Sequence, residues 1–359
     1  MHDLWRGHSC LPCPGCNLGP CGHLFGSGGK PRVHTGTPDT ADTSVCATVV
    51  RFLLVFAAAF HLIAAERITT GPPKMLVETG AREGPSWDPA SSTLYYVGGD
   101  RVMRRGMDGK VEVFRDNAPG ANGSLVDRQG RVLVCEAGAR RVTRTEKDGS
   151  LTILADNYEG KKLNSPNDLS IDSKGRIYFT DPRYGRMDDM EMPVEAVYRI
   201  DAPGKIARVT THEVERPNGI FVSAGDRYLY IADNYNNRIG GARKLYRFDL
   251  KGDGTIVPNS RKTIFDWKTG RGPDGFRMDR EGRFYVAAGL NKASQFETTD
   301  EFKGGIYILS PEGKLIEFVP FPKDETTNCA FGGPDLKTLF VTSGGQLWSV
   351  PVSTPGPKR

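Results

Sequence analysis

Residues 216–222 read RPNGIFV, and residues 272–278 read GPDGFRM. In both stretches a proline, a small polar residue and a glycine precede an apolar run. Such a proline–glycine stretch is typical of a tight turn, and the apolar run after it predicts a strand. Asn218 and Asp274 would therefore lie where a loop enters a strand. Whether these residues only shape turns or also form a site depends on how often the pattern recurs.

The pattern recurs along most of the chain. Alignment on the polar residue gives six positions separated by 39, 45, 51, 56 and 54 residues, namely Glu83, Asn122, Asn167, Asn218, Asp274 and Asn328. A second apolar run follows each position, at 94–97, 131–134, 176–179, 228–231, 283–286 and 338–341. Strand-rich units of this period predict a propeller in which each unit is one blade of about four antiparallel strands. The sequence therefore predicts an all-β fold, a six-bladed β-propeller over residues 66–359. An open β-sandwich would not explain one polar residue at the same place in each unit.

The six aligned side chains would surround the central channel of such a propeller. Carboxylate and amide oxygens that converge on one axis form a site of the kind that Ca²⁺ prefers. Four of the positions are followed five residues later by an aspartate that precedes a turn, and we predict a structural role for these four: Asp88, Asp127, Asp172 and Asp279.

The motifs EGPSW (83–87), NSPNDL (164–169), RPNGI (216–220), PDGFRMD (273–279) and TTNCAFGG (326–333) together resemble the gluconolactonase/regucalcin (senescence marker protein) family. Residues 148–185 look especially like its bacterial gluconolactonase branch. The resemblance implies a six-bladed propeller with a divalent cation in the channel, most simply Ca²⁺, with Zn²⁺, Mn²⁺ or Mg²⁺ as alternatives. It implies four metal ligands, which are Glu83, Asn167, Asn218 and Asp274. Regucalcin has an arginine where this chain has Ser165, so the substrate contacts of that arginine do not carry over.

Two stretches after second strands offer candidate substrate-binding residues. FTDPRYG (179–185) and IADNYNNR (231–238) would lie near the channel mouth. Their polar side chains could hold a polyhydroxylated substrate, and the candidates are Asp181, Arg183, Tyr184, Asp233, Tyr235 and Asn236. The alternative for the two aspartates is a turn that caps the strand. Asn122 and Asn328 belong to the ring but are predicted to orient waters or backbone groups.

The chemistry that remains is metal-assisted hydrolysis. Five of the six histidines precede residue 66, which leaves His212, so a Ser-His-Asp triad or a histidine metal site is disfavoured. The predicted function is a metal-dependent hydrolase that opens sugar lactones such as D-glucono-1,5-lactone, with Asp274 as the general base. The alternatives are a phosphotriesterase-like hydrolase on the same metal site and a non-catalytic binding propeller with a structural metal.

The N-terminal region predicts export. Arg51 precedes the apolar stretch FLLVFAAAFHLIAA, which ends in small residues. Residues 49–65 are therefore predicted to be a secretory signal peptide, and the protein to be secreted or periplasmic without a stable membrane span after cleavage. Residues 1–48 are predicted to be an unstructured leader that reflects a gene-start error, with the true start near Val45, Val49 or Val50. Their C-x₂-C-x₂-C-x₄-C spacing could hold zinc or an iron–sulfur cluster, but no strand or helix orients it.

The net charge bears on the class of binding partner, and the remaining cysteines bear on disulfide formation. The formal charge is +5, no basic tract gathers on one face, and nucleic-acid recognition modules are absent from the sequence. The predicted partner is a small sugar lactone. After residue 65 the cysteines are Cys135 and Cys329, and their positions predict no disulfide.

Overall fold

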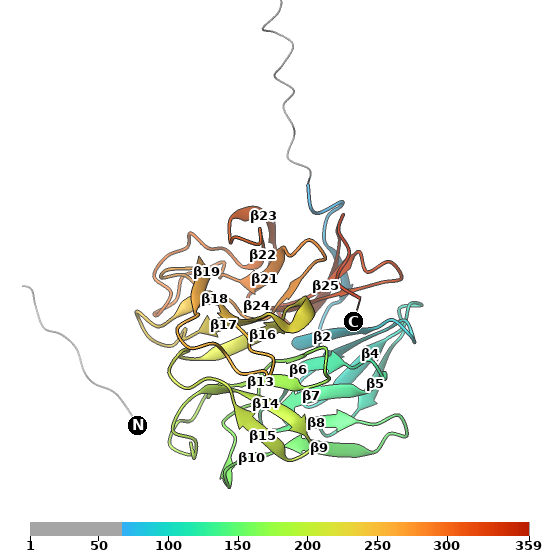
Figure 1. Cartoon of the computed structure of the whole chain (residues 1–359). Helices are drawn as coiled ribbons and strands as arrows, with labels where there is room; N and C mark the ends of the chain where they lie inside the picture. Colours follow the sequence, from blue (N-terminus) through green and yellow to red (C-terminus); the bar gives the residue numbers. More distant parts are fainter. Residues whose placement is uncertain (1–66, 359) are drawn as a thin grey trace, which may run out of the picture. The chain divides into compact units, whose positions relative to one another are not determined.

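The computed structural model describes residues 67–358 and shows six antiparallel four-stranded sheets arranged as a propeller (Figure 1). This confirms the predicted fold class. The predicted leader, signal peptide and leader cysteines lie outside the described residues. No helix among residues 67–358 is long and apolar enough to span a membrane, and the one helical turn there is the 3₁₀ turn η1 (Ala224–Asp226).

Each blade is one sheet whose strands follow one another from the channel outward. Blades 1 and 2 consist of β2 (Glu83–Asp88), β3 (Thr93–Val97), β4 (Val102–Arg105) and β5 (Val111–Arg115), and of β6 (Ala121–Val126), β7 (Val132–Glu136), β8 (Arg141–Thr145) and β9 (Leu151–Ala155). Blades 3 and 4 consist of β12 (Leu169–Ile171), β13 (Ile177–Asp181), β14 (Ala196–Ala202) and β15 (Lys205–Arg208), and of β16 (Pro217–Val222), β17 (Tyr228–Asn234), β18 (Arg243–Asp249) and β19 (Lys262–Asp266). Blade 5 consists of β20 (Phe276–Met278), β21 (Phe284–Ala288), β22 (Gly305–Leu309) and β23 (Leu315–Pro320).

Blade 6 combines the two ends of the described chain. Its inner strands are β24 (Thr326–Gly332), β25 (Thr338–Ser343) and β26 (Gln346–Pro351), and its outermost strand is β1 (Lys74–Val77). β1 pairs antiparallel with β26, with Lys74 opposite Ser349 and Met75 opposite Trp348. The first strand therefore fastens the last blade and closes the ring of blades. A short hairpin of β10 (Asn157–Tyr158) and β11 (Lys161–Lys162) extends the connection from blade 2 to blade 3.

The hydrophobic core lies between neighbouring blades. One buried cluster joins blades 2 and 3 through residues such as Leu133 and Phe179, and another joins blades 4 and 5 through Tyr230 and Phe284. Similar clusters occupy the other four interfaces, including the interface between blades 6 and 1. The apolar side chains on the face of each blade therefore pack against the neighbouring blade. This packing fixes the six inner strands around the channel.

The four aspartates that follow the ring positions are turn residues, as the sequence predicted. Asp172 Oδ1, for example, accepts the backbone N–H groups of Lys174 (3.0 Å) and Arg176 (2.9 Å), and its Oδ2 pairs with Arg176 Nε at 2.6 Å. Asp127 and Asp279 make the same pair of backbone contacts. These aspartates therefore fix the tight turns between first and second strands.

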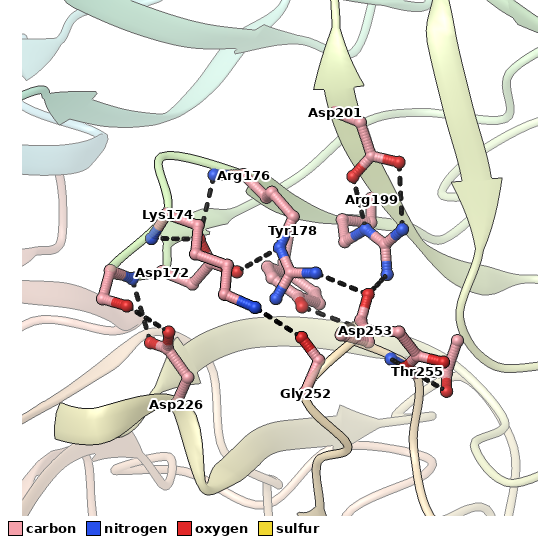
Figure 2. A network of polar contacts seen from close by, with 12 residues as sticks. Asp172, Lys174, Arg176, Tyr178, Arg199, Asp201, Asp226, Gly252, Asp253 and Thr255 are labelled. Carbon is pink, nitrogen blue, oxygen red and sulfur yellow. Dashed lines mark hydrogen bonds and ion pairs between the residues drawn. The ribbon is translucent and has the colours of Figure 1, made fainter.

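A polar network also holds blade 3 to blade 4 (Figure 2). The turn after β18 presents the carbonyl of Asp253 to the guanidinium groups of Arg176 and Arg199, the latter at 2.7 Å. Tyr178 donates its hydroxyl to the carbonyl of Gly254 at 3.1 Å. These acceptors are backbone carbonyls of one turn that donors of blade 3 already bind, so the network stabilises the blade interface.

Candidate functional site

The six aligned residues form a closed ring around the channel, here called the channel ring (Glu83, Asn122, Asn167, Asn218, Asp274 and Asn328). Each lies at or just before the N-terminal end of an inner strand. In blades 1, 2, 4 and 6 the pairing of the first two strands is irregular at this point, between Glu83 and Ser86, Ala121 and Ser124, Pro217 and Ile220, and Thr326 and Asn328. A β-bulge re-aims the side chains beside it.

Contacts between neighbouring inner strands establish the order of the ring. Asn167 O accepts the backbone N–H of Gly123 at 2.7 Å, and Asn218 O accepts the Thr180 hydroxyl at 2.7 Å. The backbone N–H of Gly275 donates to Thr327 O at 2.7 Å. The Asn328 amide then donates to Glu83 Oε2 at 3.0 Å, which joins blade 6 to blade 1.

Glycine permits the closest approaches in this ring. A Cβ atom on Gly84 would lie 2.4 Å from Asn122 O, and one on Gly219 would lie 2.3 Å from Asp274 O. No side chain fits at such distances, so the glycine that follows four of the six ring residues lets the next blade come close. The recurring glycine of the sequence motif therefore serves the site as well as the turn.

Two of the ring residues, Glu83 and Asp274, carry carboxylates, and the charge of one disfavours the charge of the other. Burial, and secondarily the Asp168 carboxylate, raises the pKa of Glu83 to about 7. Burial also raises the pKa of Asp274 well above its ordinary value, with the nearby Glu83 carboxylate as the next cause. Two buried carboxylates that disfavour each other's charge are the arrangement that a dication stabilises.

The amides of the ring provide the test of whether a cation fits. Oδ1 of Asn167 and Oδ1 of Asn122 are buried and have no hydrogen-bond partner among the described residues. Asn218 donates its amide nitrogen to the Tyr184 hydroxyl at 2.9 Å, which leaves Oδ1 for another group. Buried amide oxygens without donors are costly unless something positive binds them. The ring therefore fits a hard cation.

Asn328 has a different role from these amides. Its nitrogen holds Glu83 Oε2, and its Oδ1 accepts the N–H of Cys329 at 2.8 Å. Glu83 Oε2 accepts the N–H of Gly84 as well, at 2.6 Å. Asn328 therefore orients the Glu83 side chain, whereas the sequence prediction was that it orients waters or backbone groups. No group of three or more His, Cys, Asp or Glu side chains in residues 67–358 could hold a metal, so amide oxygens would have to complete the site.

Asp181 and Asp233 lie behind the ring and support it. Asp181 accepts the N–H groups of Asn164 and Ser165 at 2.8 Å each. Asp233 accepts those of Glu215 and Arg216 in the same way, also at 2.8 Å. Each aspartate thus holds the residues two and three positions before a ring asparagine. Both are almost fully buried, and this geometry favours the turn-forming alternative over direct substrate contact.

The remaining predicted substrate residues divide into two kinds. The Arg183 guanidinium is used by two loops of blade 3: it donates to Asn164 O at 2.9 Å, Ser165 Oγ at 3.0 Å and Arg186 O at 2.7 Å, and it pairs with Asp189. Asn236 Oδ1 accepts the Gly272 N–H at 3.0 Å, whereas its buried Nδ2 has no partner among residues 67–358.

Tyr184 and Tyr235 are placed at the mouth by an arginine that sequence reasoning did not single out. The Arg216 guanidinium lies 5.3 Å from the Tyr184 ring centre and 4.2 Å from that of Tyr235, and Glu195 binds it twice at 2.8 Å. Tyr184 as a whole is 41% exposed. Its hydroxyl is nevertheless surrounded by protein atoms, and this burial, followed by the Asp274 charge, raises the pKa of the hydroxyl. The only sequence signal was the place of Arg216 in RPNGI.

A second missed feature crosses the channel beside the ring. Asp168 follows Asn167, and its Oδ2 lies 3.5 Å from Nη1 of Arg277, which belongs to blade 5. Both side chains are buried. Arg271, near Asp274, pairs with Glu297 at 3.0 Å and with Glu325 at 2.6 Å. No spacing in the sequence shows that these pairs meet, because their members come from different loops.

Comparison with known proteins agrees with this geometry. A family model described as "SMP-30/Gluconolactonase/LRE-like region" matches residues 81–345. The chain belongs to this family. A gluconolactonase of Zymomonas mobilis is 30% identical over 253 residues, which cover 68% of this chain and 65% of that protein, slightly less than two thirds of its length. Regucalcin of Xenopus laevis is 29% identical over 73% of this chain and 82% of that protein. The solved structure of a Xanthomonas campestris gluconolactonase has 30% identity and a TM-score of 0.69, and the match covers 82% of this chain and 93% of that one.

Proposed function

We propose that this family member is a metal-dependent hydrolase that opens sugar lactones, with D-glucono-1,5-lactone as the first substrate to test. The relatives called gluconolactonase support the reaction class. The observation that carries the metal part is the buried, partnerless Oδ1 of Asn167 in a ring that contains two carboxylates. Glu83, Asn167, Asn218 and Asp274 would hold the cation.

The donor set favours Ca²⁺. All four proposed ligands offer oxygen, two as carboxylates and two as amides, and this combination suits Ca²⁺ better than a soft transition metal. Zn²⁺, Mn²⁺ and Mg²⁺ remain the alternatives to be compared. When bound, the cation would polarise the lactone carbonyl and stabilise the negative charge that develops on its oxygen.

Asp274 is the proposed general base. Asp274 is less buried than Glu83, so water can reach it more easily, and Glu83 is also held by Gly84 and Asn328. The Asp274 carboxylate would take a proton from a water molecule whose oxygen then bonds to the lactone carbonyl carbon. The ring C–O bond breaks in the next step, and the leaving alkoxide takes up that proton to give the aldonic acid. As a ligand beside the cation, the Asp274 carboxylate would have a lowered pKa and act as a weak base, and a lactone is reactive enough for a weak base to suffice.

The mouth residues support a polyhydroxylated substrate. Tyr184, Tyr235 and Arg216 form a wall of two aromatic faces around a guanidinium, and Asn236 adds a partnerless amide nitrogen. Aromatic faces and amide donors bind sugar rings and hydroxyl groups, whereas a phosphotriesterase-like site calls for an apolar pocket. We also propose that the protein is exported, on the basis of the apolar stretch after Arg51.

The test compares wild type with Asp274→Asn in a lactone panel. Proton release above the buffer blank is measured with Ca²⁺, Zn²⁺, Mn²⁺ and Mg²⁺ in turn. Asp274→Asn keeps one oxygen and nearly the same shape, so it should still bind the metal weakly but lose turnover by about 100-fold or more. Wild-type turnover in this variant would show that Asp274 is not the base. Binding of the metal without turnover of any lactone by the wild type would favour the non-catalytic alternative.

A further inference from the structure

A cavity lies at the opposite end of the channel from the ring. It has a volume of about 470 Å³, within the range of roughly 300–1,000 Å³ that is usual for small-molecule sites. Trp87, Phe221, Met278 and Phe331 line it from the C-terminal parts of four inner strands. Glu83 and Trp87 are four residues apart on β2, which corresponds to about 13 Å along a strand. The cavity is therefore separate from the proposed active site.

The end of the chain closes one side of this cavity. The backbone N–H of Gly356 donates to Leu336 O at 2.9 Å, and the N–H of Arg280 donates to Pro355 O at 3.1 Å. Pro357 and Lys358, which follow, line the cavity together with Trp87. The wall is thus formed by a tail that two hydrogen bonds hold in place.

The charges around the cavity are unbalanced. Three cationic side chains line it, Arg277, Arg280 and Lys358, against one carboxylate, Asp335. Arg277 is paired with Asp168 in the channel, but Arg280 and Lys358 have no ion-pair partner among residues 67–358. Asp335 accepts the N–H of Lys337 at 3.0 Å. An apolar hollow with aromatic walls and two uncompensated cations at its rim is complementary to an amphipathic anion.

We propose that this cavity binds a small organic acid with an apolar alkyl or aryl body and a single anionic head. The body would pack on Trp87, Phe221 and Phe331, and the head would lie toward Arg280 and Lys358. The cavity lining contains none of the ring residues, although Arg277, which pairs with Asp168 beside the ring, forms part of its wall. Its ligand would therefore differ in kind from a sugar lactone, which is neutral and carries many hydroxyl groups.

The experiment measures displacement of a fluorescent probe from the full-length protein. 8-Anilinonaphthalene-1-sulfonate, an aryl sulfonate, is bound first, and octanoate or octan-1-ol is then titrated against it. Octanoate should displace the probe at least several-fold more effectively than octan-1-ol, because only octanoate carries a charge for the rim. Equal displacement by the two compounds, or none by either, would overturn the proposal.

Two sets of variants locate the binding. The double variant Arg280→Gln/Lys358→Gln should weaken octanoate binding by about 3- to 10-fold, since it removes two partly exposed charges, and leave octan-1-ol unchanged. Lys262→Gln, an exposed cation on β19 that does not line the cavity, is the control and should have no effect. Ala330→Leu places extra bulk in the cavity wall and should reduce binding of both compounds in protein whose melting temperature shows that it is folded. Wild-type octanoate affinity in the double variant, or in folded Ala330→Leu, would refute the site.

Discussion

Gly275→Ala tests the channel ring without replacing any proposed ligand. A Cβ atom at Gly275 would lie 2.1–2.4 Å from three side-chain atoms of Asn328. Asn328 is only 2% exposed and cannot rotate into solvent, so its amide would have to turn away from its two hydrogen bonds. In the first, the Asn328 amide nitrogen donates to Glu83 Oε2 at 3.0 Å. In the second, Asn328 Oδ1 accepts the Cys329 N–H at 2.8 Å.

The expected loss follows from those two contacts. A hydrogen bond to a charged group contributes about 1.5–3 kcal/mol and a neutral one about 0.5–1.5 kcal/mol, so the free energy of unfolding should fall by roughly 2–4 kcal/mol. For a domain of this size the melting temperature would then fall by roughly 3–7 °C. Because Asn328 orients a proposed ligand, metal affinity should fall by about 10-fold.

Thermal unfolding and calorimetric titration with Ca²⁺ measure the two effects. Gly252→Ala is the matched control, because no heavy atom lies within 4 Å of a Cβ placed there. It should leave both the melting temperature and the Ca²⁺ affinity close to those of wild type. If Gly275→Ala behaved like Gly252→Ala, the packing of blade 5 against Asn328 would not position Glu83, and the ring described here would be wrong.

Three further predictions concern the same region. Exhaustive chelation should lower the melting temperature and Ca²⁺ should restore it, because the cation binds the folded state only; an unchanged melting temperature would contradict a metal site. In chelator, the melting temperature should fall as the pH rises from about 4 to about 7, because burial, as the largest cause, raises the pKa of Glu83 and Asp181 to about 7 and of Asp233 to about 6. Raised carboxyl pKa values mean that the folded state holds more protons, so stability is full at low pH and is lost on deprotonation; a rise over this range would refute the assignment. Asp181→Ala should lower stability by about 2–4 kcal/mol and weaken Ca²⁺ binding, since two buried N–H groups lose their acceptor next to a ring residue; intact stability with a raised KM alone would instead support substrate contact.

The repeated motifs predicted the part of the fold that recurs. A turn with a polar residue and glycine, followed by two apolar runs, specifies the inner strands of a blade wherever it occurs, and all six second strands lie where these runs predicted them. The closure by β1 was not predicted, because KMLV (74–77) precedes the first motif and has the pattern of any short strand. Its partner β26 is more than 250 residues away, and only the curvature of the whole ring brings the two together.

The candidate site was predictable to the same extent. The ring positions follow from periodicity, since residues at equivalent places in each blade must surround one axis. The contacts between different loops do not repeat, so Arg216, Glu195 and the pair of Asp168 with Arg277 were missed. The roles of Asp181 and Asp233 were left open for a related reason. A carboxylate that follows a strand can bind a substrate or its own backbone, and only the position of the preceding loop decides.

The pair formed by Asp168 and Arg277 explains why the ring remains available for a cation. Asp168 raises the pKa of Glu83, and Arg277 lowers it by a smaller amount, so Arg277 does not neutralise the ring carboxylate. The guanidinium of Arg277 is 3.5 Å from Asp168 and also donates to Phe276 O at 2.7 Å, which keeps it from pairing with Glu83. Had Arg277 bound Glu83 directly, one of the two ring carboxylates would already be neutralised. As it stands, neither Glu83 nor Asp274 has an ion-pair partner among residues 67–358, and burial raises the pKa of both. The proposed dication would stabilise the charged form of both carboxylates and bind the free amide oxygen of Asn167.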